Sequence, residues 1–506
     1  MSPLNEILVK GRRVKAQRPW PRVFVASKIW DRVSKELADG HLTLLGLWGE
    51  ADAVHMALLN EKPFDIAVVT FEVTDGTFPS VGAIHPPALR LERTIRDLYG
   101  LEPVGLPDQR PWLDHGRWGL THPLGSRTPA PSVSARYPFL PAEGEGLHQI
   151  PVGPVHAGII EPGHFRFTAN GETVVRLEQR LGYTHKGVES LMRGTDVDRA
   201  ARLAGRISGD STVAYATAFA HAVEAAWTVK VPPRAAWLRA LMAELERLAN
   251  HFGDFGAICN DASFSIMHAQ CGMLRERILR AAAASFGHRL MMDCVVPGGV
   301  VADLSPDGAV EVRNLLTEIG HLFPKLVDLY DNTASLQDRT VTTGILTPAL
   351  ARQFGAGGYV GRASGRSFDA RRAIAYPPYD KLKFDIPVLA EGDVNARVWI
   401  RIREIEQSLA LVEQILDQLP TGPVRVDIDP RNTAGASEGL GLVEGFRGDV
   451  LAWVRLDGAG AIARCHLRDP SWFQWPLLEA VIEGNIVADF PLCNKSFNCS
   501  YSGHDL

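Results

Sequence analysis

Residues 232–261 read PPRAAWLRALMAELERLANHFGDFGAICND. Apolar side chains recur here at steps of three and four residues, at Trp237, Leu241, Leu245, Leu248 and Phe252. This spacing places them on one face of a helix and predicts a long helix that begins at the two prolines. The same spacing recurs later at Ile402, Ile405, Leu409, Val412, Leu416 and Leu419. We interpret both stripes as faces of core helices and assign neither to a cofactor.

The first part of the chain alternates between strand-like and helix-like segments. Apolar runs at residues 22–27, 41–48 and 65–73 predict strands. The sequence His85-Pro86-Pro87, followed by ALRLERTIRDLYG, predicts a helix with proline in its first turn and Gly100 just past its end. We therefore expect an N-terminal α/β domain over residues 1–125.

The composition changes after this domain. Residues 126–152 are rich in proline and glycine and are typical of an extended linker. A domain over residues 153–506 follows, with a small β-rich entry that turns at Asn170-Gly171, then long helices, and a small sheet near residues 451–470. The predicted fold class is α+β, with a mainly helical second domain. GAGGYVGRASG at residues 355–365 lacks the spacing of a dinucleotide-binding loop, so we interpret it as a flexible connection.

Charge and cysteine content exclude several classes of protein. The net charge of the 506 residues is −5, which provides no basic field for nucleic acid or anionic lipid. No apolar run approaches the roughly 20 residues of a membrane-spanning helix, and the first residues do not resemble a signal peptide. The six cysteines form no CxxC pair, so we expect buried thiols and neither a zinc site nor a disulfide framework.

Polar residues gather in four glycine-containing stretches, and such loops often carry reactive groups. These stretches are residues 153–167 with His156, Glu161 and His164; residues 183–189 with His185 and Glu189; residues 205–211 with Arg206, Ser208, Asp210 and Ser211; and the tail 489–506 with Cys493, Asn498 and Cys499. By itself each is a weak signal. The serines before residue 212, for example, are also typical of a helix N-cap.

The order of these pieces resembles a known family. Seven stretches are similar, in this order, to parts of the large subunit shared by [NiFe] hydrogenases and NADH:quinone oxidoreductase. They are GPVHAG, LGYTHKGVE, ELERLANHFGDFGAICND, VVPGGV, DNTASLQDRTVTTGIL, EGFRGD and DFPLCNKSFN. The earlier stretch HPPALRLERTIRDLYGLEPVGLPDQRPWLDH resembles the end of the small α/β subunit beside it in complex I. Over nearly its whole length the chain thus resembles a fusion of the two, as in hydrogenases 3 and 4.

The nickel ligands of that family are missing. The resemblance implies four thiolates, from an RxCGxC pair and a DPCxxC pair, because soft sulfur ligands suit nickel. The first pair reads Arg206-Ile207-Ser208-Gly209-Asp210-Ser211, with serine at both cysteine positions. In the second region Cys499 falls one position early in a gapless alignment. At most one thiolate of four remains, so we expect no metal site and no nickel-iron centre.

Other positions of the family's site are retained. The resemblance implies that Glu161 stands where hydrogenases carry a proton-passing glutamate, and that Arg447 matches an arginine overhanging the metal. His156 and His164 match the neighbourhood of a hairpin loop that approaches the quinone in complex I. We predict a metal-free polar pocket suited to receiving a proton with an electron. Its catalytic residues are Glu161, His164, His185, Arg206, Asp210 and Arg447, and its cofactor-facing positions are His156, Ser208 and Ser211.

The resemblance also implies in which kind of complex the chain works and with which partners. We expect a subunit in the soluble arm of a membrane-bound oxidoreductase related to hydrogenase 4, on the cytoplasmic face of the cell membrane, with electron transfer coupled to ion movement. Its partners would be an iron-sulfur subunit carrying a [4Fe-4S] cluster and antiporter-like membrane subunits. The chain would bind no cofactor alone, and quinone is a candidate ligand. Two alternatives stay open, a non-catalytic structural or coupling subunit and a true [NiFe] hydrogenase with unusual ligands.

Overall fold

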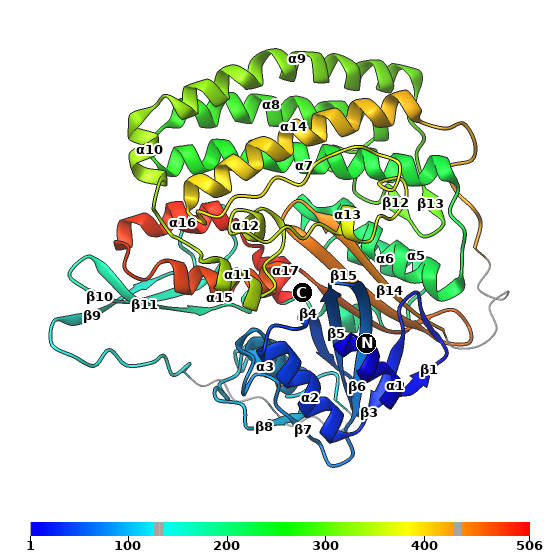
Figure 1. Cartoon of the computed structure of the whole chain (residues 1–506), viewed down its shortest axis with the longest axis vertical. Coiled ribbons are helices and arrows are strands. Elements are labelled where there is room, and N and C mark those ends of the chain that lie inside the picture. Colours follow the sequence, from blue (N-terminus) through cyan, green and yellow to red (C-terminus); the bar gives the residue numbers. More distant parts are fainter. Residues whose placement is uncertain (1, 126–130, 132–135, 429–436) are drawn as a thin grey trace.

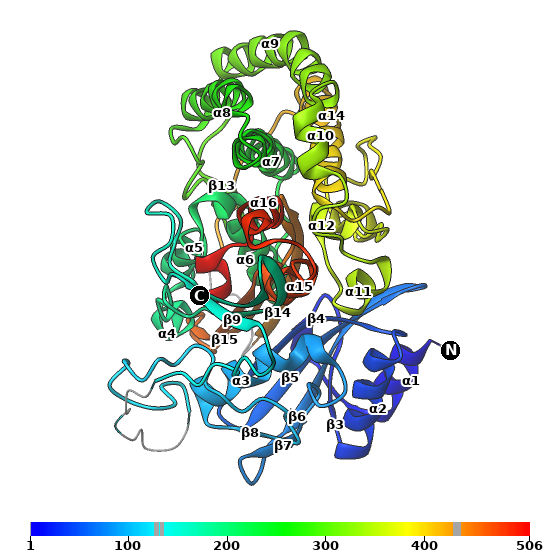
Figure 2. The same ribbon diagram turned by 90° about the vertical axis from the view of Figure 1, so that its left-hand side faces the viewer.

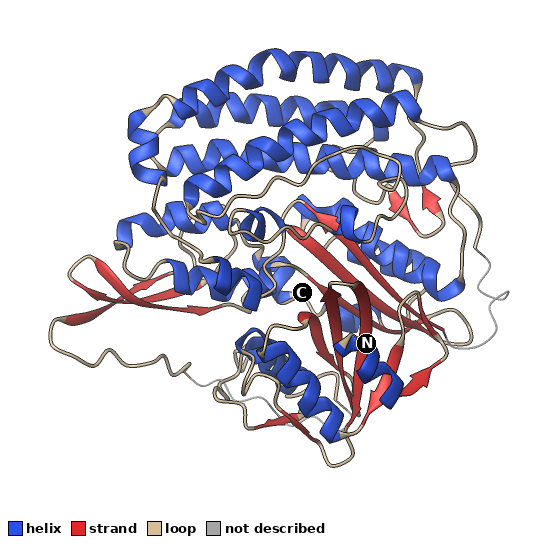
Figure 3. Ribbon diagram, viewed as in Figure 1, coloured by secondary structure: helices blue, strands red, loops and turns tan. Residues whose placement is uncertain are grey.

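The computed structural model describes residues 2–125, 131, 136–428 and 437–506. Long helices stack at one end of the molecule, and most strands lie toward the other end (Figures 1 and 3). The predicted α+β class is confirmed. Among the described residues, no helix is both long enough and apolar enough to cross a membrane.

The N-terminal domain is built on a five-stranded sheet with the order β1-β3-β6-β5-β4. Its strands are β1 (Arg12–Val14), β3 (Arg22–Val25), β4 (Thr43–Gly49), β5 (Ala53–Glu61) and β6 (Phe64–Glu72). Helices α1 (Pro3–Lys10), α2 (Ser27–Ala38) and α3 (Leu89–Tyr99) belong to the same domain (Figure 1). The three strands expected from the sequence are present as β3, β4 and β6.

Strand β5 is absent from the expectations drawn from the sequence, although it pairs with both β4 and β6. Eight of its nine residues are buried, so the strand lacks the alternation that marks a half-exposed strand. One reason is that the sheet contributes Ala57 and Leu59 to a core shared with Leu440 and Trp453 of the second domain. A buried ion pair between Arg22 and Glu438, at 2.6 Å, also joins the two domains.

Helix α3 ends as the sequence predicts. Pro86 and Pro87 lie in a single 3₁₀ turn immediately before it. Gly100 follows it with a φ of 69°, and its N–H donates to the carbonyl of Arg96. This left-handed cap directs the chain into the long segment that leads to the second domain.

The β-rich entry is a three-stranded antiparallel sheet of β9 (Leu147–Val152), β10 (His164–Asn170) and β11 (Thr173–Arg180). The turn at Asn170-Gly171 is confirmed. Strand β9 falls within the segment assigned to the linker, and it pairs along β10 from Val152 to Leu147. Residues 126–130 and 132–135 of that predicted linker lie outside the described residues.

Four long helices form the upper layer: α7 (Pro233–Asp261), α8 (Ser265–Phe286), α9 (Pro306–Asp331) and α14 (Val394–Gln418) (Figures 1 and 2). Both predicted stripes are confirmed as faces of α7 and α14. Trp237 and Leu245 are buried on α7, as are Ile405 and Val412 on α14. The remaining helices are α4 (Val188–Met192), α5 (Val197–Ala204), α6 (Thr212–Trp227), α10 (Ala334–Thr340), α11 (Pro348–Gln353), α12 (Gly358–Arg362), α13 (Ala370–Ala373), α15 (Ser471–Val481), α16 (Phe490–Phe497) and α17 (Tyr501–Asp505).

A second sheet lies between the helical layer and the N-terminal domain. It contains β14 (Ser437–Gly445), β15 (Gly448–Leu456) and β16 (Ile462–Arg468), and β2 (Gln17–Arg18) extends it in parallel with β14. The small sheet expected near residues 451–470 is therefore present, and the N-terminal part of the chain completes it. The short strands are β7 (Thr77–Pro79), β8 (Glu102–Val104), β12 (Val295–Val296) and β13 (Gly299–Val300).

The glycine-rich segment 355–365 is not the flexible connection that its composition suggests. It contains the buried helix α12, and its backbone packs tightly against the β14–β15 hairpin. Gly358 has a φ of 59°, and a Cβ there would clash with the carbonyl group of Arg447. The glycines are thus needed for close backbone approach, and they hold Arg447 in place.

Candidate functional site

The sequence motif at residues 208–211 forms a 3₁₀ turn that leads into α6. Ser211 occupies the N-cap position of α6, but its hydroxyl does not cap the helix. The carboxylate of Glu246 on α7 does so, accepting from the N–H groups of Val213 at 2.7 Å and Ala214 at 3.1 Å. The serines are therefore available for other contacts, and the simple N-cap interpretation does not explain them.

The tail of the chain brings a third serine to this turn. The Ser500 hydroxyl lies 3.3 Å from the Ser208 hydroxyl. We call Ser208, Ser211 and Ser500 the serine site, and all three are buried. Cys499 points elsewhere, because its thiol lies 4.0 Å from the Gln474 side chain. The residue that meets the first motif is thus Ser500, in agreement with the gapless alignment, in which Cys499 falls one position early.

The next position of the tail motif is closed to a side chain. The N–H of Gly503 donates to the Ser500 hydroxyl at 2.9 Å. A Cβ on Gly503 would lie 2.5 Å from a carboxylate oxygen of Asp469. Asp469 is itself held by the hydroxyl of Tyr215 at 2.6 Å and by the N–H of Ser471 at 2.8 Å. No cysteine fits there without displacing this carboxylate.

Asp210 and Arg447 lie at the centre of the serine site. The Arg447 guanidinium donates to both carboxylate oxygens of Asp210, at 3.0 and 2.5 Å, and to the Ser211 hydroxyl at 3.1 Å. It also donates to the carbonyl of Asn498 at 2.5 Å. The Ser208 hydroxyl completes the arrangement by donating to Asp210 at 2.5 Å. Arg447 thereby joins the two motifs with hydrogen bonds.

The charges of this pair are strongly coupled. Burial alone would raise the pKa of Asp210, but Arg447 and the two serine hydroxyls lower it to about 2. Burial opposes the charge of Arg447 as well, yet Asp210 raises the pKa of Arg447 well above its ordinary value. Both groups are therefore ionised across the physiological pH range. The pair has the geometry of a bidentate salt bridge in which Arg447 is buried and the Asp210 side chain is 31% exposed.

The residues present do not fit a nickel-iron centre. Neutral hydroxyls at Ser208, Ser211 and Ser500 are hard, weak ligands for nickel. Within the described parts of the chain, no group of three or more His, Cys, Asp and Glu side chains is arranged to hold a metal ion. All six cysteines carry buried free thiols.

Glu161 and His156 lie beside the tail that carries the serine site. An oxygen of the exposed Glu161 carboxylate accepts from the N–H of Ser502 at 3.1 Å. The imidazole of His156 lies 3.2 Å from the Tyr501 hydroxyl and 3.1 Å from the carbonyl of Pro154. These two side chains thus connect the predicted hairpin region to the ligand-motif tail, close to Ser500.

His164 is placed differently. It begins β10, where its ring lies 3.3 Å from the carbonyl of Gly153, and Arg166 donates to its other nitrogen at 3.3 Å. Burial and the charge of Arg166 lower the pKa of His164. The histidine is therefore neutral near pH 7 and accepts a hydrogen bond inside the β-rich entry.

Arg206 is separated from the other predicted residues. Its guanidinium pairs with both oxygens of Asp293, at 2.5 and 2.6 Å, on the surface. Nearly half of the Arg206 side chain is exposed. The structure therefore brings Asp210, Arg447, Ser208 and Ser211 together, with Glu161 and His156 nearby, but it directs Arg206 outward.

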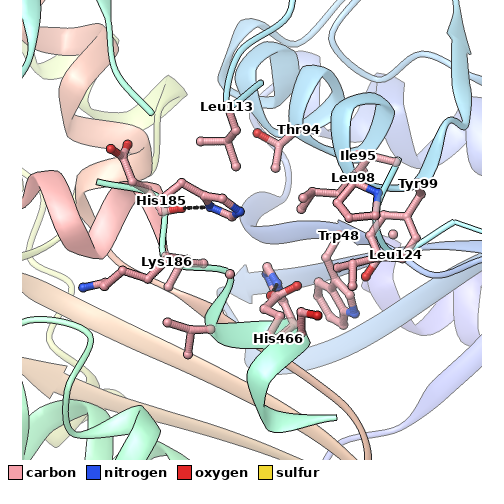
Figure 4. Close-up of a pocket in the computed structure, with 18 of the residues that line it drawn as sticks. Trp48, Thr94, Ile95, Leu98, Tyr99, Leu113, Leu124, His185, Lys186 and His466 are labelled. Carbon is pink, nitrogen blue, oxygen red and sulfur yellow. Dashed lines mark hydrogen bonds and ion pairs between the residues drawn. The ribbon is translucent and has the colours of Figure 1, made fainter. Parts of the chain in front are cut away.

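His185 lines a cavity of about 390 Å³ between the two domains (Figure 4). Its ring is oriented by the carbonyl of Asp505 at 2.7 Å and lies beside Trp118. Lys186 turns away from the cavity, and its ammonium donates to the carbonyl of Ile207 at 2.8 Å. The His185–Lys186 loop thus touches both the cavity and the serine motif.

Several residues of the site are not singled out by the sequence. These residues are Ser500 and Tyr501 in the tail, Lys186 just before α4, and Glu246 on α7. For Ser500 a signal exists. The gapless alignment of the tail places Asn498-Cys499-Ser500 on the family's Asp-Pro-Cys.

Family models match most of the chain, in separate parts. Residues 27–133 match the respiratory-chain NADH dehydrogenase 30 Kd subunit. Residues 186–258 match nickel-dependent hydrogenase, and residues 263–438 and 431–505 match the respiratory-chain NADH dehydrogenase 49 Kd subunit. Formate hydrogenlyase subunit 5 of Escherichia coli is 33% identical over 85% of this chain and 77% of its own length. The chain belongs to the complex I and group 4 hydrogenase large-subunit family.

Other members of this large-subunit family are similar over most of their length. A hydrogenase-4 component of Escherichia coli is 32% identical over 90% of this chain and 80% of its own length. A solved structure of the membrane-bound sulfane sulfur reductase, an archaeal respiratory membrane complex, contains a chain of similar fold. That chain has a TM-score of 0.67 and 26% identity, and the match covers 72% of this chain and 99% of that one. Together with the family models, these relatives confirm the predicted fusion of two complex I subunit types in one chain.

Proposed function

We propose that this large-subunit family member works in a membrane-bound oxidoreductase complex as a nickel-free subunit. In this proposal its polar pocket receives an electron and a proton, with a quinone or a related acceptor as the substrate, and the step is coupled to ion movement. The partners would be an iron-sulfur subunit carrying a [4Fe-4S] cluster and antiporter-like membrane subunits. The complex would lie on the inner face of the cell membrane.

One observation carries this proposal. Arg447 donates to Asp210 and Ser211 in the place where the family's metal ligands converge. The salt bridge keeps the two ligand motifs together without a metal, so the surrounding residues remain positioned for another reaction. Glu161 and His156 lie beside the tail and are partly accessible, which suits groups that exchange protons with a substrate.

Elemental analysis tests the nickel-free part of the proposal. The complex is purified with its natural partners, and nickel and iron are counted per copy of this chain. Iron at cluster stoichiometry without nickel is the expected result. Stoichiometric nickel would overturn the proposal and support a hydrogenase with an unusual ligand set.

Variants test the catalytic part. Glu161→Gln and His156→Asn are expected to lower electron transfer to a water-soluble quinone by about 10²-fold, because each removes a partly accessible group that can exchange protons. Glu311→Gln and His321→Asn change the same residue types on the outer helix α9 and are the matched controls. Gel filtration of each variant complex establishes that the subunits stay associated.

A non-catalytic structural or coupling role is the second candidate, and the same ion pair favours it. Asp210 and Arg447 are satisfied by hydrogen bonds within this chain, as expected for residues that only hold the fold together. Unchanged turnover in the Glu161 and His156 variants, with the complex intact, would favour this role over catalysis.

A further inference from the structure

A buried path of hydrogen-bonded side chains connects the N-terminal domain to both strands of the β14–β15 hairpin. In this hairpin Glu438 and Arg455 lie directly opposite each other. Arg22 on β3 donates to both carboxylate oxygens of Glu438, at 2.8 and 2.6 Å. Arg455 donates to the carboxylate of Glu50, just after β4, at 2.8 Å. The N-terminal domain thus holds the two strands of one hairpin at the same cross-strand pair.

His55 on β5 and Thr70 on β6 complete the path inside the N-terminal domain, where they lie opposite each other in the sheet. Nδ1 of His55 lies 2.9 Å from the Thr70 hydroxyl, and Nε2 lies 3.0 Å from a carboxylate oxygen of Glu50. Arg22 donates to the same hydroxyl at 3.2 Å. We call these six residues the interdomain clamp: Glu438, Arg22, Thr70, His55, Glu50 and Arg455.

The donors and acceptors of the interdomain clamp fix the state of His55. Burial opposes the ionisation of Glu50, but its contacts with His55 and Arg455 lower its pKa to about 2. The Glu50 carboxylate therefore accepts a hydrogen bond from Nε2–H of His55. The Thr70 hydroxyl accepts from Arg22, so it donates its own proton to Nδ1 of His55. This arrangement requires a neutral imidazole with its proton on Nε2.

Aromatic rings enclose His55, whose side chain is fully buried. The rings of Trp48 on β4 and Trp453 on β15 each lie 5.3 Å from the His55 ring, measured between centroids. His466 on β16 stacks on the same Trp48, and its Nδ1 is hydrogen-bonded to Glu189. No space is thus left in which a charged His55 could be hydrated.

The charges around His55 balance. Among the described residues, the charged groups that face it are Glu50 before β5, Arg22 on β3 and Glu438 on β14. Arg455 on β15 pairs with Glu50. Two carboxylates and two guanidinium groups therefore leave no net charge that would stabilise an imidazolium. Burial is the largest influence and lowers the pKa of His55 below its ordinary value.

A second proton on the His55 ring disrupts this arrangement. With both nitrogens protonated the ring only donates, so the Thr70 hydroxyl loses the acceptor for its own proton. The buried imidazolium also costs free energy that contact with water would relieve. We propose that the interdomain clamp is a pH-sensitive contact, which is closed while His55 is neutral and opens when His55 takes up a proton.

The clamped hairpin also carries Arg447. Its strands pair without interruption from Ser437 and Leu456 to Gly445 and Gly448, and Arg447 lies in the turn between them. The interdomain clamp therefore holds one end of the hairpin, and the serine site lies at the other end. No residue of the serine site belongs to the interdomain clamp, so its opening is independent of the proposed function.

Hydrogen exchange in the purified complex tests the proposal. The N–H of Glu438 donates to the carbonyl of Ala16 at 3.1 Å, which joins the hairpin to the N-terminal part of the chain. Its exchange rate therefore reports opening of the interdomain clamp. His55→Gln is the informative variant, because the glutamine amide donates to Glu50 and accepts from Thr70 as the neutral imidazole does, but takes up no proton. Comparing the two chains at the same pH removes the intrinsic pH dependence of exchange.

The native chain and His55→Gln should exchange the Glu438 N–H at equal rates at pH 8, where His55 is neutral. At pH 5 the native chain should exchange about ten- to thirtyfold faster, because a histidine with the ordinary pKa of about 6.5 in the open state binds a proton there. His221→Gln, on α6 and outside the interdomain clamp, is the matched control. Its exchange should follow that of the native chain at both pH values.

Thr70→Val tests the clamp without changing the histidine. The variant removes the hydroxyl that donates to His55 and should exchange the Glu438 N–H about three- to tenfold faster than the native chain at pH 8. Native exchange in this variant would overturn the proposal. Equal exchange of the native chain and His55→Gln at pH 5 would overturn it too, as would faster exchange of His55→Gln at pH 8. These readouts are independent of nickel content and of turnover in the Glu161 variants.

Discussion

The hydroxyl of Ser500 lies 3.3 Å from that of Ser208, although the two residues are 292 positions apart in the chain. Two motifs that supply metal ligands in the family thus still meet in space, but they meet through hydroxyl groups. The Asp210–Arg447 salt bridge, together with the serine hydroxyls, keeps them together.

The contact between these serines predicts a cross-link. In the double variant Ser208→Cys with Ser500→Cys, the two sulfur atoms are expected to be within reach of a disulfide. Oxidation with diamide, digestion and mass spectrometry should then recover the linked peptides. The single variant Ser208→Cys retains the native Cys499, whose thiol faces Gln474, and should give no cross-link. A disulfide between position 208 and Cys499 would show that our assignment of the tail is wrong.

Removal of Arg447 should destabilise the protein strongly. Arg447→Met leaves the Asp210 carboxylate, whose side chain is 31% exposed, without its counter-charge, and the expected loss is about 1–3 kcal/mol in the free energy of unfolding. Adding Asp210→Asn to that variant should recover much of the loss, because no unpaired charge then remains. Thermal unfolding of the full chain measures both effects. Arg206→Met is the control, since it breaks an exposed bidentate pair with Asp293 and should cost only about 0–1 kcal/mol.

A buried charge cluster predicts a pH dependence of stability. Arg247, Arg362 and Arg371 face four carboxylates, those of Glu244, Asp369, Glu404 and Glu444. Because carboxylates outnumber guanidinium groups, one of them is expected to hold a proton near neutral pH. Burial, followed by the charge of Asp369, raises the pKa of Glu444 from its ordinary 4.5 to about 7.

Glu444→Gln should remove this dependence. A raised pKa means that the stabilising contribution of the Glu444 proton is fully present below about pH 4.5 and is lost as pH rises through about 7. Relative to the native chain, the variant should therefore gain stability between pH 5 and pH 8, by up to about 3 kcal/mol. Denaturant unfolding at several pH values measures the difference. A constant difference between the two chains, as expected for the exposed Glu311→Gln control, would refute the assignment.

Gly503 should not tolerate a side chain. Its Cβ would lie 2.5 Å from Asp469, and Asp469 is held in place by Tyr215 and Ser471. Gly503→Ala is therefore expected to lower the free energy of unfolding by about 1–3 kcal/mol. Gly272→Ala, in α8, meets nothing within 4 Å and should instead stabilise by about 0.5–1 kcal/mol. If both variants gained stability in thermal unfolding, the proposed steric block at Gly503 would be refuted.

The sequence alone was sufficient where a property depends on local spacing or on the chemistry of one residue. The stripes on α7 and α14 could be predicted because an apolar face repeats every three to four residues. The loss of thiolates at Ser208 and Ser211 could be predicted because a hydroxyl cannot replace a thiolate on nickel. The order of the motifs was enough to indicate the family.

Only the tertiary structure decided which distant groups meet. Three features depend on where the backbone passes in space. They are the pairing of β5 with β4 and β6, the contact of Ser500 with Ser208, and the orientation of Arg206 toward Asp293 at the surface. The interdomain cavity is lined by residues from distant parts of the chain, such as Trp48 and His466. Residue identity specifies what each group can donate or accept, but the packing of the domains decides whether a partner is within reach.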